Sequence, residues 1–222
     1  MKIVIAPDSF KGGMTAKEAA DAIESGLKRI FPDADYVKIP MADGGEGTVQ
    51  ALVDATDGQL VTKRVTGPLG DPVNATFGLL GDHQTAVIEM AAASGLETIP
   101  KEKLNPLLTT TFGTGELILA ALDNHVKHII LGIGGSATVD GGAGMAQALG
   151  VRLLDASGMP PHPGGGALSP LPHIDPPGIA TRLEAFSVVV PYSVTHPTPD
   201  TTGAAPFFGL ATAATPAQRR HF

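Results

Sequence analysis

Four polar, glycine-rich loops hold most of the residues in this chain that could carry out chemistry. The longest covers residues 132–144 and follows an apolar stretch at 128–131. Glycine tolerates positive φ and lets backbone N–H groups approach a ligand closely. A glycine-rich turn that leaves a strand is where α/β proteins offer such groups to phosphate. Because Ser136, Thr138 and Asp140 add two hydroxyls and a carboxylate to this turn, we predict a phosphate-handling α/β protein.

The other three loops add the charges that phosphoryl transfer requires. They cover residues 7–13, 42–48 and 111–116 and combine glycine with hydroxyl side chains, carboxylates and one lysine. In open α/β sheets, ligands collect at the carboxyl ends of strands, where such loops lie. A lysine and backbone N–H groups can neutralise phosphate there, while carboxylates hold Mg²⁺ and orient the attacking hydroxyl.

Each loop also has a purely structural interpretation. Asp43 can form an Asp-Gly turn with the glycines that follow it. Glu46 and Asp140 precede expected helices, where a carboxylate is favourable because of the helix dipole and the free N–H groups. Thr114 can cap a helix in a similar way. The presence of four such loops in one acidic chain favours the functional interpretation.

Two known phosphate-binding motifs fit the chain poorly. A P-loop requires a glycine directly before its lysine, whereas Lys11 precedes Gly12. The dinucleotide fingerprint fits better, since residues 132–137 read GIGGSA and Asp155 ends the next expected strand. Its helix should begin inside the motif, but the glycine pair at 141–142 disfavours helix there. A nicotinamide-dependent oxidoreductase is therefore the lesser alternative.

Alternating strands and helices are expected to position these loops. The first elements expected are a strand at 2–6, a helix opened by a Thr15–Glu18 capping box, a strand at 36–40 and a helix at 49–55. This order predicts a mainly parallel sheet. The later elements expected are strands at 59–66, 73–80, 85–90, 126–131 and 151–154, and helices at 116–122 and 145–149. We predict two α/β domains, 1–68 with the parallel sheet and 69–222 with a mixed sheet and a loop-rich tail.

Composition excludes several classes of function. The 222 residues include 22 acidic and 15 basic ones, a net charge of −7, and no run of Lys or Arg, which disfavours nucleic-acid binding. The absence of cysteine excludes disulfides and cysteine metal sites. No stretch approaches the roughly 20 apolar residues of a membrane helix, and the N-terminus does not resemble a signal peptide. We expect a cytoplasmic protein without membrane or nucleic-acid partners, whose oligomeric state the sequence leaves open.

In these loops the chain resembles the glycerate kinase type-1 family. The matching segments are 6–12, 41–48, 111–118, 132–150 and 164–166, in family order, and the resemblance covers the chain from its start to about residue 190. The resemblance implies ATP-dependent, Mg²⁺-requiring phosphorylation of glycerate to a phosphoglycerate. It also implies two α/β domains with the site in the cleft between them.

Matching residue by residue carries the family's roles onto this chain. Asp43 and Lys11 are implied to be catalytic, with Asp43 as the acidic group near the reacting hydroxyl. Metal ligands are not assigned. The residues implied to bind substrate or phosphate are Ser9, Gly44, Gly45, Thr48, Gly113, Thr114, Gly115, Glu116, Gly134, Gly135, Ser136, Thr138 and Asp140.

The last part of the chain departs from the family pattern. Family members are longer and carry further glycine- and acid-rich motifs that this chain lacks. Residues 192–198 read YSVTHPT, with Ser193 where the family has an aspartate, and residues 208–215 lack the family's lysine. We therefore expect a C-terminally incomplete chain, and the alternative to an active kinase is a non-catalytic, ligand-binding fragment of one.

Overall fold

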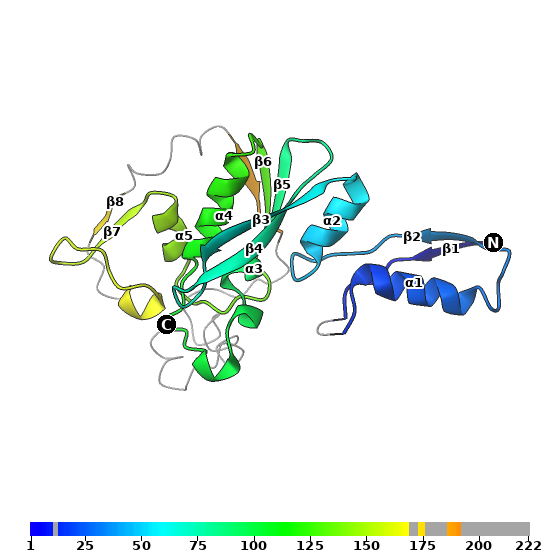
Figure 1. Cartoon of the computed structure of the whole chain (residues 1–222), viewed down its shortest axis with the longest axis horizontal. Helices are drawn as coiled ribbons and strands as arrows, with labels where there is room; N and C mark the ends of the chain where they lie inside the picture. The colour runs from blue at the N-terminus through cyan, green and yellow to red at the C-terminus, as the bar shows by residue number, and fades with distance from the viewer. Residues whose placement is uncertain (11–12, 169–172, 176–185, 192–222) are drawn as a thin grey trace.

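The computed structural model describes residues 1–10, 13–168, 173–175 and 186–191 (Figure 1). Within them, a small unit of residues 1–41, called the N-terminal unit below, extends from a larger body. Lys11 and the divergent segments 192–198 and 208–215 lie outside the described residues.

The N-terminal unit is a single βαβ motif, as its sequence predicted. Strands β1 (Lys2–Ile5) and β2 (Asp35–Lys38) pair in parallel, and α1 (Ala16–Leu27) connects them. The predicted capping box is confirmed, since Thr15 Oγ1 accepts from the Glu18 N–H at 3.1 Å and Glu18 Oε2 accepts from the Thr15 N–H at 2.8 Å. Because the strands are parallel, the loops that follow them leave from the same edge.

The larger body contains a mixed sheet of strand order β3-β4-β5-β6-β9. Its strands are β3 (Gln59–Thr66), β4 (Pro72–Leu79), β5 (Thr85–Glu89), β6 (His128–Gly132) and β9 (Ser187–Val189). The first three are antiparallel, while β5, β6 and β9 are parallel. This confirms the predicted α/β class with a mixed second sheet. The predicted domain division at 68/69 stays a prediction, and it falls between β3 and β4, which pair with each other.

Helices cover both faces of this sheet. The alternating side chains of β5 show which helices lie on each face. Ile88 is fully buried beneath α4 (Phe112–Leu122) and α3 (Ala91–Ser94), together with Phe77 and Leu117. Its neighbour Val87 faces the other way and packs beneath α2 (Thr48–Thr56). Gly78 of β4 lets α2 approach, because a Cβ there would lie 2.4 Å from Val53 Cγ2.

The remaining elements lie beyond α4. Helix α5 (Ala143–Ala148) packs against α4, and β7 (Arg152–Leu154) pairs antiparallel with β8 (His173–Asp175). Single 3₁₀ turns occur at Leu96–Thr98, Lys101–Lys103 and Gly165–Ala167. In the part of the chain that the structure describes, no helix is long and apolar enough to span a bilayer.

The largest error in an expected helix boundary is at the start of α4. The helix predicted at 116–122 begins at Phe112, so the Gly-Thr-Gly segment expected as a turn is helical. A Cβ on Gly113 would lie 1.9 Å from Thr66 O of β3, and a Cβ on Gly115 would lie 2.6 Å from Ala148 Cβ of α5. Close packing against two neighbours therefore outweighs the low helix propensity of glycine.

Candidate active site at the carboxyl ends of the parallel strands

The loops of the N-terminal unit and the body meet at a pocket. It has a volume of about 230 Å³ and is lined by Ser9, Phe10, Gly13, Met14, Thr15, Glu18, Glu46 and Gly47. Ser9 Oγ donates to Glu46 O at 3.3 Å. Two of the four predicted loops, 7–13 and 42–48, are therefore brought together.

The loop at 42–48 is held in a defined turn by its own side chains. Asp43 Oδ1 accepts from the Gly45 N–H at 3.0 Å, as the structural interpretation of this turn has it, while a catalytic role for Asp43 stays a prediction. Buried Thr48 donates through Oγ1 to Gly45 O at 2.7 Å and accepts from the Gly44 N–H at 3.2 Å. The Thr48 hydroxyl is thus used inside the loop. Asp43 is exposed, and its Oδ2 makes no hydrogen bond to the described residues, so this oxygen is available to a ligand.

The start of the 132–144 loop lies directly against the 42–48 loop. The Gly134 N–H donates to Gly44 O at 3.2 Å. A Cβ on Gly132 would lie 2.4 Å from Gly44 O, and one on Gly134 would lie 2.9 Å from Gly45 Cα. Glycine is needed at both positions because the backbone of the 132–144 loop packs directly against the backbone of the 42–48 loop. The structure therefore gathers three of the predicted loops at one edge.

The middle of the 132–144 loop folds on itself. Ser136 Oγ lies 2.9 Å from Thr138 Oγ1 and accepts from the Thr138 N–H at 3.0 Å. Gly135 is exposed with φ of +73°, a conformation that glycine adopts without strain. Ser136 and Thr138 are partly exposed, so this part of the turn is accessible to a ligand.

Asp140, by contrast, is buried inside the body at 2% exposure. Its carboxylate accepts from the N–H groups of Gly142 and Gly144 at 3.0 and 3.1 Å, at the start of α5. It also accepts from the Thr111 N–H at 2.8 Å and from Thr111 Oγ1 at 2.9 Å. These contacts match the structural interpretation of Asp140 at a helix start, and a role for Asp140 in binding substrate or phosphate stays a prediction.

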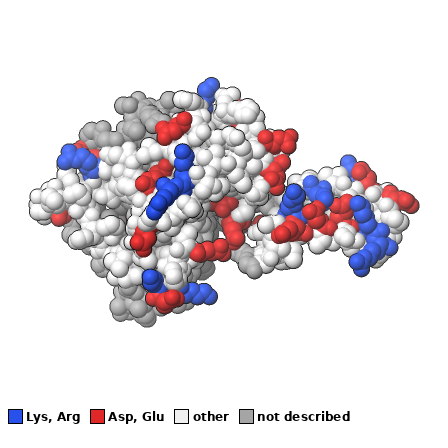
Figure 2. Space-filling model, in the orientation of Figure 1, with Lys and Arg blue, Asp and Glu red and all other residues white. Residues whose placement is uncertain are grey.

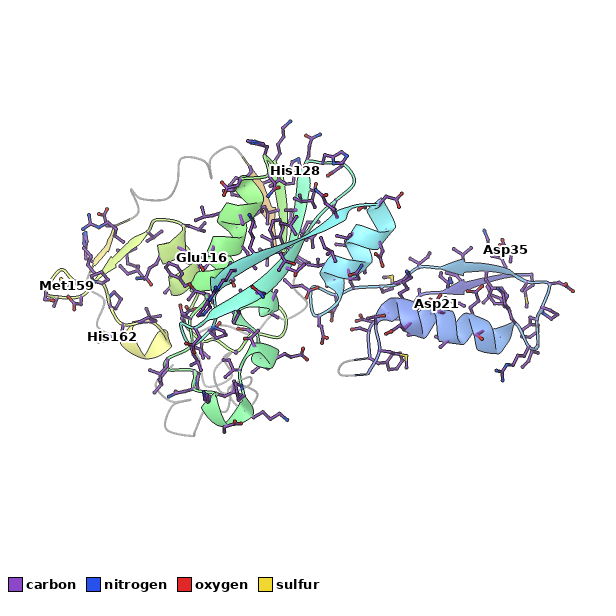
Figure 3. All side chains as sticks on the ribbon, in the orientation of Figure 1. Asp21, Asp35, Glu116, His128, Met159 and His162 are labelled. Atoms are coloured by element: carbon purple, nitrogen blue, oxygen red, sulfur yellow. The ribbon has the colours of Figure 1, made fainter. Side chains whose placement is uncertain are left out.

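The residues predicted at 113–116 lie in the first turns of α4 rather than at the pocket. Thr114 Oγ1 is buried 2.9 Å from Ser94 Oγ. Glu116 Oε2 accepts from the Thr66 N–H at 2.6 Å, and Figure 3 shows Glu116 on α4, well separated from the N-terminal unit. A ligand-binding role for this segment stays a prediction. The side chains of Thr114 and Glu116 already form hydrogen bonds within the body.

Sequence reasoning missed Glu89, the last residue of β5. Its Oε1 accepts from the Val49 N–H of α2 at 2.7 Å. Burial raises the pKa of this carboxyl, the Val49 N–H opposes the rise, and the negative charge of Glu46 adds to it. An acidic residue that directly follows the apolar run at 86–88 was the available signal.

Comparison with known proteins identifies the family. The glycerate kinase family model matches residues 3–222. The chain belongs to the glycerate kinase family. It is 60% identical over 215 residues to the glycerate kinase of Bacillus subtilis, covering 97% of this chain and 56% of that protein. It is 56% identical to the glycerate 2-kinase of Escherichia coli, covering 94% of this chain and 55% of that protein.

A solved structure confirms the fold of this family member. A crystal structure assigned as glycerate kinase 2 from Salmonella typhimurium LT2 superposes with a TM-score of 0.89 at 56% identity. The superposition covers 100% of this chain and 59% of the chain in that crystal structure. The chain thus spans just over half the length of the relatives it matches.

The described pocket of this glycerate kinase family chain is acidic. Glu18 and Glu46 line it, and Asp43 is exposed on the adjoining turn. Figure 2 shows acidic atoms on both sides of the narrow connection between the N-terminal unit and the body. Among the described residues, no group of three or more His, Asp or Glu side chains is arranged to hold a metal by itself. The acidic side chains described here would disfavour an anionic ligand unless a positive group lies beside it.

Proposed function

We propose that this chain forms part of a cytoplasmic, ATP-dependent kinase that transfers phosphate to glycerate. The observation that carries the proposal is that the 42–48 loop, on which Asp43 is exposed, contacts the 7–13 loop beside one pocket and also contacts the start of the 132–144 loop. Relatives with 56–60% identity are named glycerate kinases, which supports the same substrate here.

Phosphoryl transfer needs little covalent chemistry from the protein and depends on position and charge. In the proposed mechanism, Asp43 Oδ2 accepts the proton of the attacking glycerate hydroxyl. The Asp-Gly turn holds Asp43 through the Gly45 N–H, so the carboxylate has little freedom to rotate away. The N–H groups of Gly135 and Ser136 are proposed to contact an anionic group of glycerate or ATP.

ATP and glycerate are both negatively charged, so binding them beside an acidic pocket requires positive charge nearby. Lys11 is proposed to contact the transferred phosphate, although it lies outside the described residues. Mg²⁺ bound with ATP would supply the remaining positive charge, and it usually takes only one or two protein carboxylates besides phosphate oxygens. Glu46 is the other exposed carboxylate of the 42–48 loop, and it fits such a role.

Two alternatives make different predictions. A nicotinamide-dependent oxidoreductase is disfavoured because α5 begins only at Ala143 and the carboxylate of Asp140 already occupies its N-terminus. The ligand-binding fragment is the stronger rival, since the chain spans just over half the length of its relatives.

Calorimetry combined with a coupled assay of ADP release separates these possibilities. The proposal expects Mg-ATP and glycerate to bind and ADP to appear only when glycerate is present. Binding of both ligands without turnover would support the fragment instead. Absence of binding for both ligands would contradict either version, and binding of NAD(H) alone would support the oxidoreductase.

A further inference from the structure

Helix α2 begins without the side-chain cap that most helices use. Its N-cap residue is Gly47, which has φ of +91° and makes no side-chain hydrogen bond. The first N–H groups of a helix have no partner within the helix, and a Ser, Thr, Asp or Asn side chain at the N-cap usually accepts from one of them. The Thr48 N–H donates to Gly45 O at 3.3 Å, whereas the acceptor of the next N–H, that of Val49, comes from elsewhere in the chain.

Glu89 provides that acceptor from the end of β5, 40 positions along the chain. Its Oε1 lies 2.7 Å from the N–H of Val49, the second residue of α2. The N–H groups of Gly47 and Thr48 also interact favourably with the carboxylate, while Glu46 is the charged side chain that acts against it. A carboxylate at this place is favourable because it faces the positive end of the helix dipole.

The same residue lies where the site loops meet. Glu89 pairs with Gly132 across β5 and β6, and the N–H of the next residue, Met90, donates to Gly132 O at 2.9 Å. Gly132 in turn lies against Gly44, one residue after Asp43. The Glu89 side chain therefore links the start of α2 to the strand ends that support the 42–48 loop.

We propose that Glu89 is a positioning residue: its carboxylate caps α2 from the neighbouring strand and thereby holds Asp43 and the 42–48 loop beside the pocket. The link to catalysis rests on the proposed function, whereas the capping role does not. Glu89 itself does not line the pocket. Because its carboxylate fills the α2 N-terminus, glycerate or phosphate must bind on the outer side of the loop and not to these helix N–H groups.

Amide hydrogen exchange followed by NMR tests the capping role without any ligand. Glu89→Ala should raise the exchange rate of the Val49 N–H at least about tenfold, as expected for a lost hydrogen bond to a charged acceptor, and should shift the resonances of Gly44 and Gly45. Glu89→Gln should preserve both, because its amide oxygen still accepts from Val49. If Glu89→Ala does not fold, Glu89→Asp serves instead, since it keeps the charge but is one methylene too short to reach.

Asp54→Ala is the matched control. Asp54 is an exposed carboxylate on the same helix, where it accepts from Gln50 Nε2 at 2.7 Å. The control should leave the exchange of Val49 unchanged. Unchanged exchange of Val49 in Glu89→Ala, or equal loss in Glu89→Gln and Glu89→Ala, would overturn the proposal.

Kinetics then tests the link to the reaction. In a chain with glycerate-dependent turnover, Glu89→Ala or Glu89→Asp should lower kcat and raise KM for glycerate, whereas Glu89→Gln should restore both to within about threefold. If Glu89→Gln loses as much activity as Glu89→Ala and Glu89→Asp, positioning through this hydrogen bond is contradicted. If the unaltered chain shows no turnover, the proposed function fails, and hydrogen exchange still decides whether Glu89 holds the loop.

Discussion

The carboxylate of Asp140 accepts two kinds of hydrogen bond from Thr111, one from its backbone N–H at 2.8 Å and one from its hydroxyl at 2.9 Å. Thr111 immediately precedes α4, and its Oγ1 accepts in turn from the Met145 N–H of α5 at 2.9 Å. One buried pair therefore fixes the starts of two packed helices relative to each other. Asp140, the one charged residue of the 132–144 loop, is thus hydrogen-bonded inside the body.

Asp140→Ala should lower the free energy of unfolding by about 3 kcal/mol, because hydrogen bonds to a charged acceptor are lost and buried N–H groups are left without partners. Urea unfolding measures this change. Asp33→Ala, at an exposed position, is the control and should change stability by less than about 0.5 kcal/mol. A similarly small effect of Asp140→Ala would contradict the structural role.

Gly132→Ala should destabilise the chain and displace the 42–48 loop, because the added Cβ would lie 2.4 Å from Gly44 O. Gly26→Ala should do the opposite. Gly26 lies in α1 with nothing within 4 Å of the added Cβ, so the substitution should stabilise by about 0.5–1 kcal/mol through helix propensity. Thermal unfolding of both variants compares them directly, and equal shifts in Tm would show that the two backbones do not approach as described.

The raised pKa of Glu89 predicts a pH dependence of stability. Burial raises the pKa of this carboxyl in the folded chain above its unfolded value, so the folded state binds its proton more tightly. The associated stability is present below the unfolded pKa and is lost as pH rises through the folded pKa. Glu89→Gln cannot ionise and should not show this loss.

Urea unfolding of both proteins between about pH 4 and pH 7 checks the sign. The unfolding free energy of the unaltered chain minus that of Glu89→Gln should fall as pH rises. A difference that stays constant, or one that grows with pH, would contradict burial as the dominant cause of the raised pKa.

Local patterns in the sequence predicted most of the elements. The Thr15–Glu18 capping box, the βαβ order and the strands at 59–66 and 73–80 depend on neighbours in the chain, and the structure confirms them. The meeting of the 7–13 and 42–48 loops followed from the rule that parallel strands end at a shared edge.

Contacts between distant segments could not be predicted in this way. Glycines at 113 and 134 look alike in sequence, but the first faces Thr66 O of β3 and the second faces the backbone of Gly45. The Glu89–Val49 hydrogen bond joins residues 40 positions apart. Only the packed structure shows which glycines bring backbones together and which carboxylates are already used by helix starts.

Glycerate-dependent ADP release by Asp43→Asn is the most direct test of the central claim that the 42–48 loop carries the reacting acid. With Mg-ATP and glycerate, kcat should fall roughly 100-fold or more, the usual loss when a general base is removed, while Asp33→Asn should retain the rate of the unaltered chain. An unchanged kcat in Asp43→Asn would contradict the account.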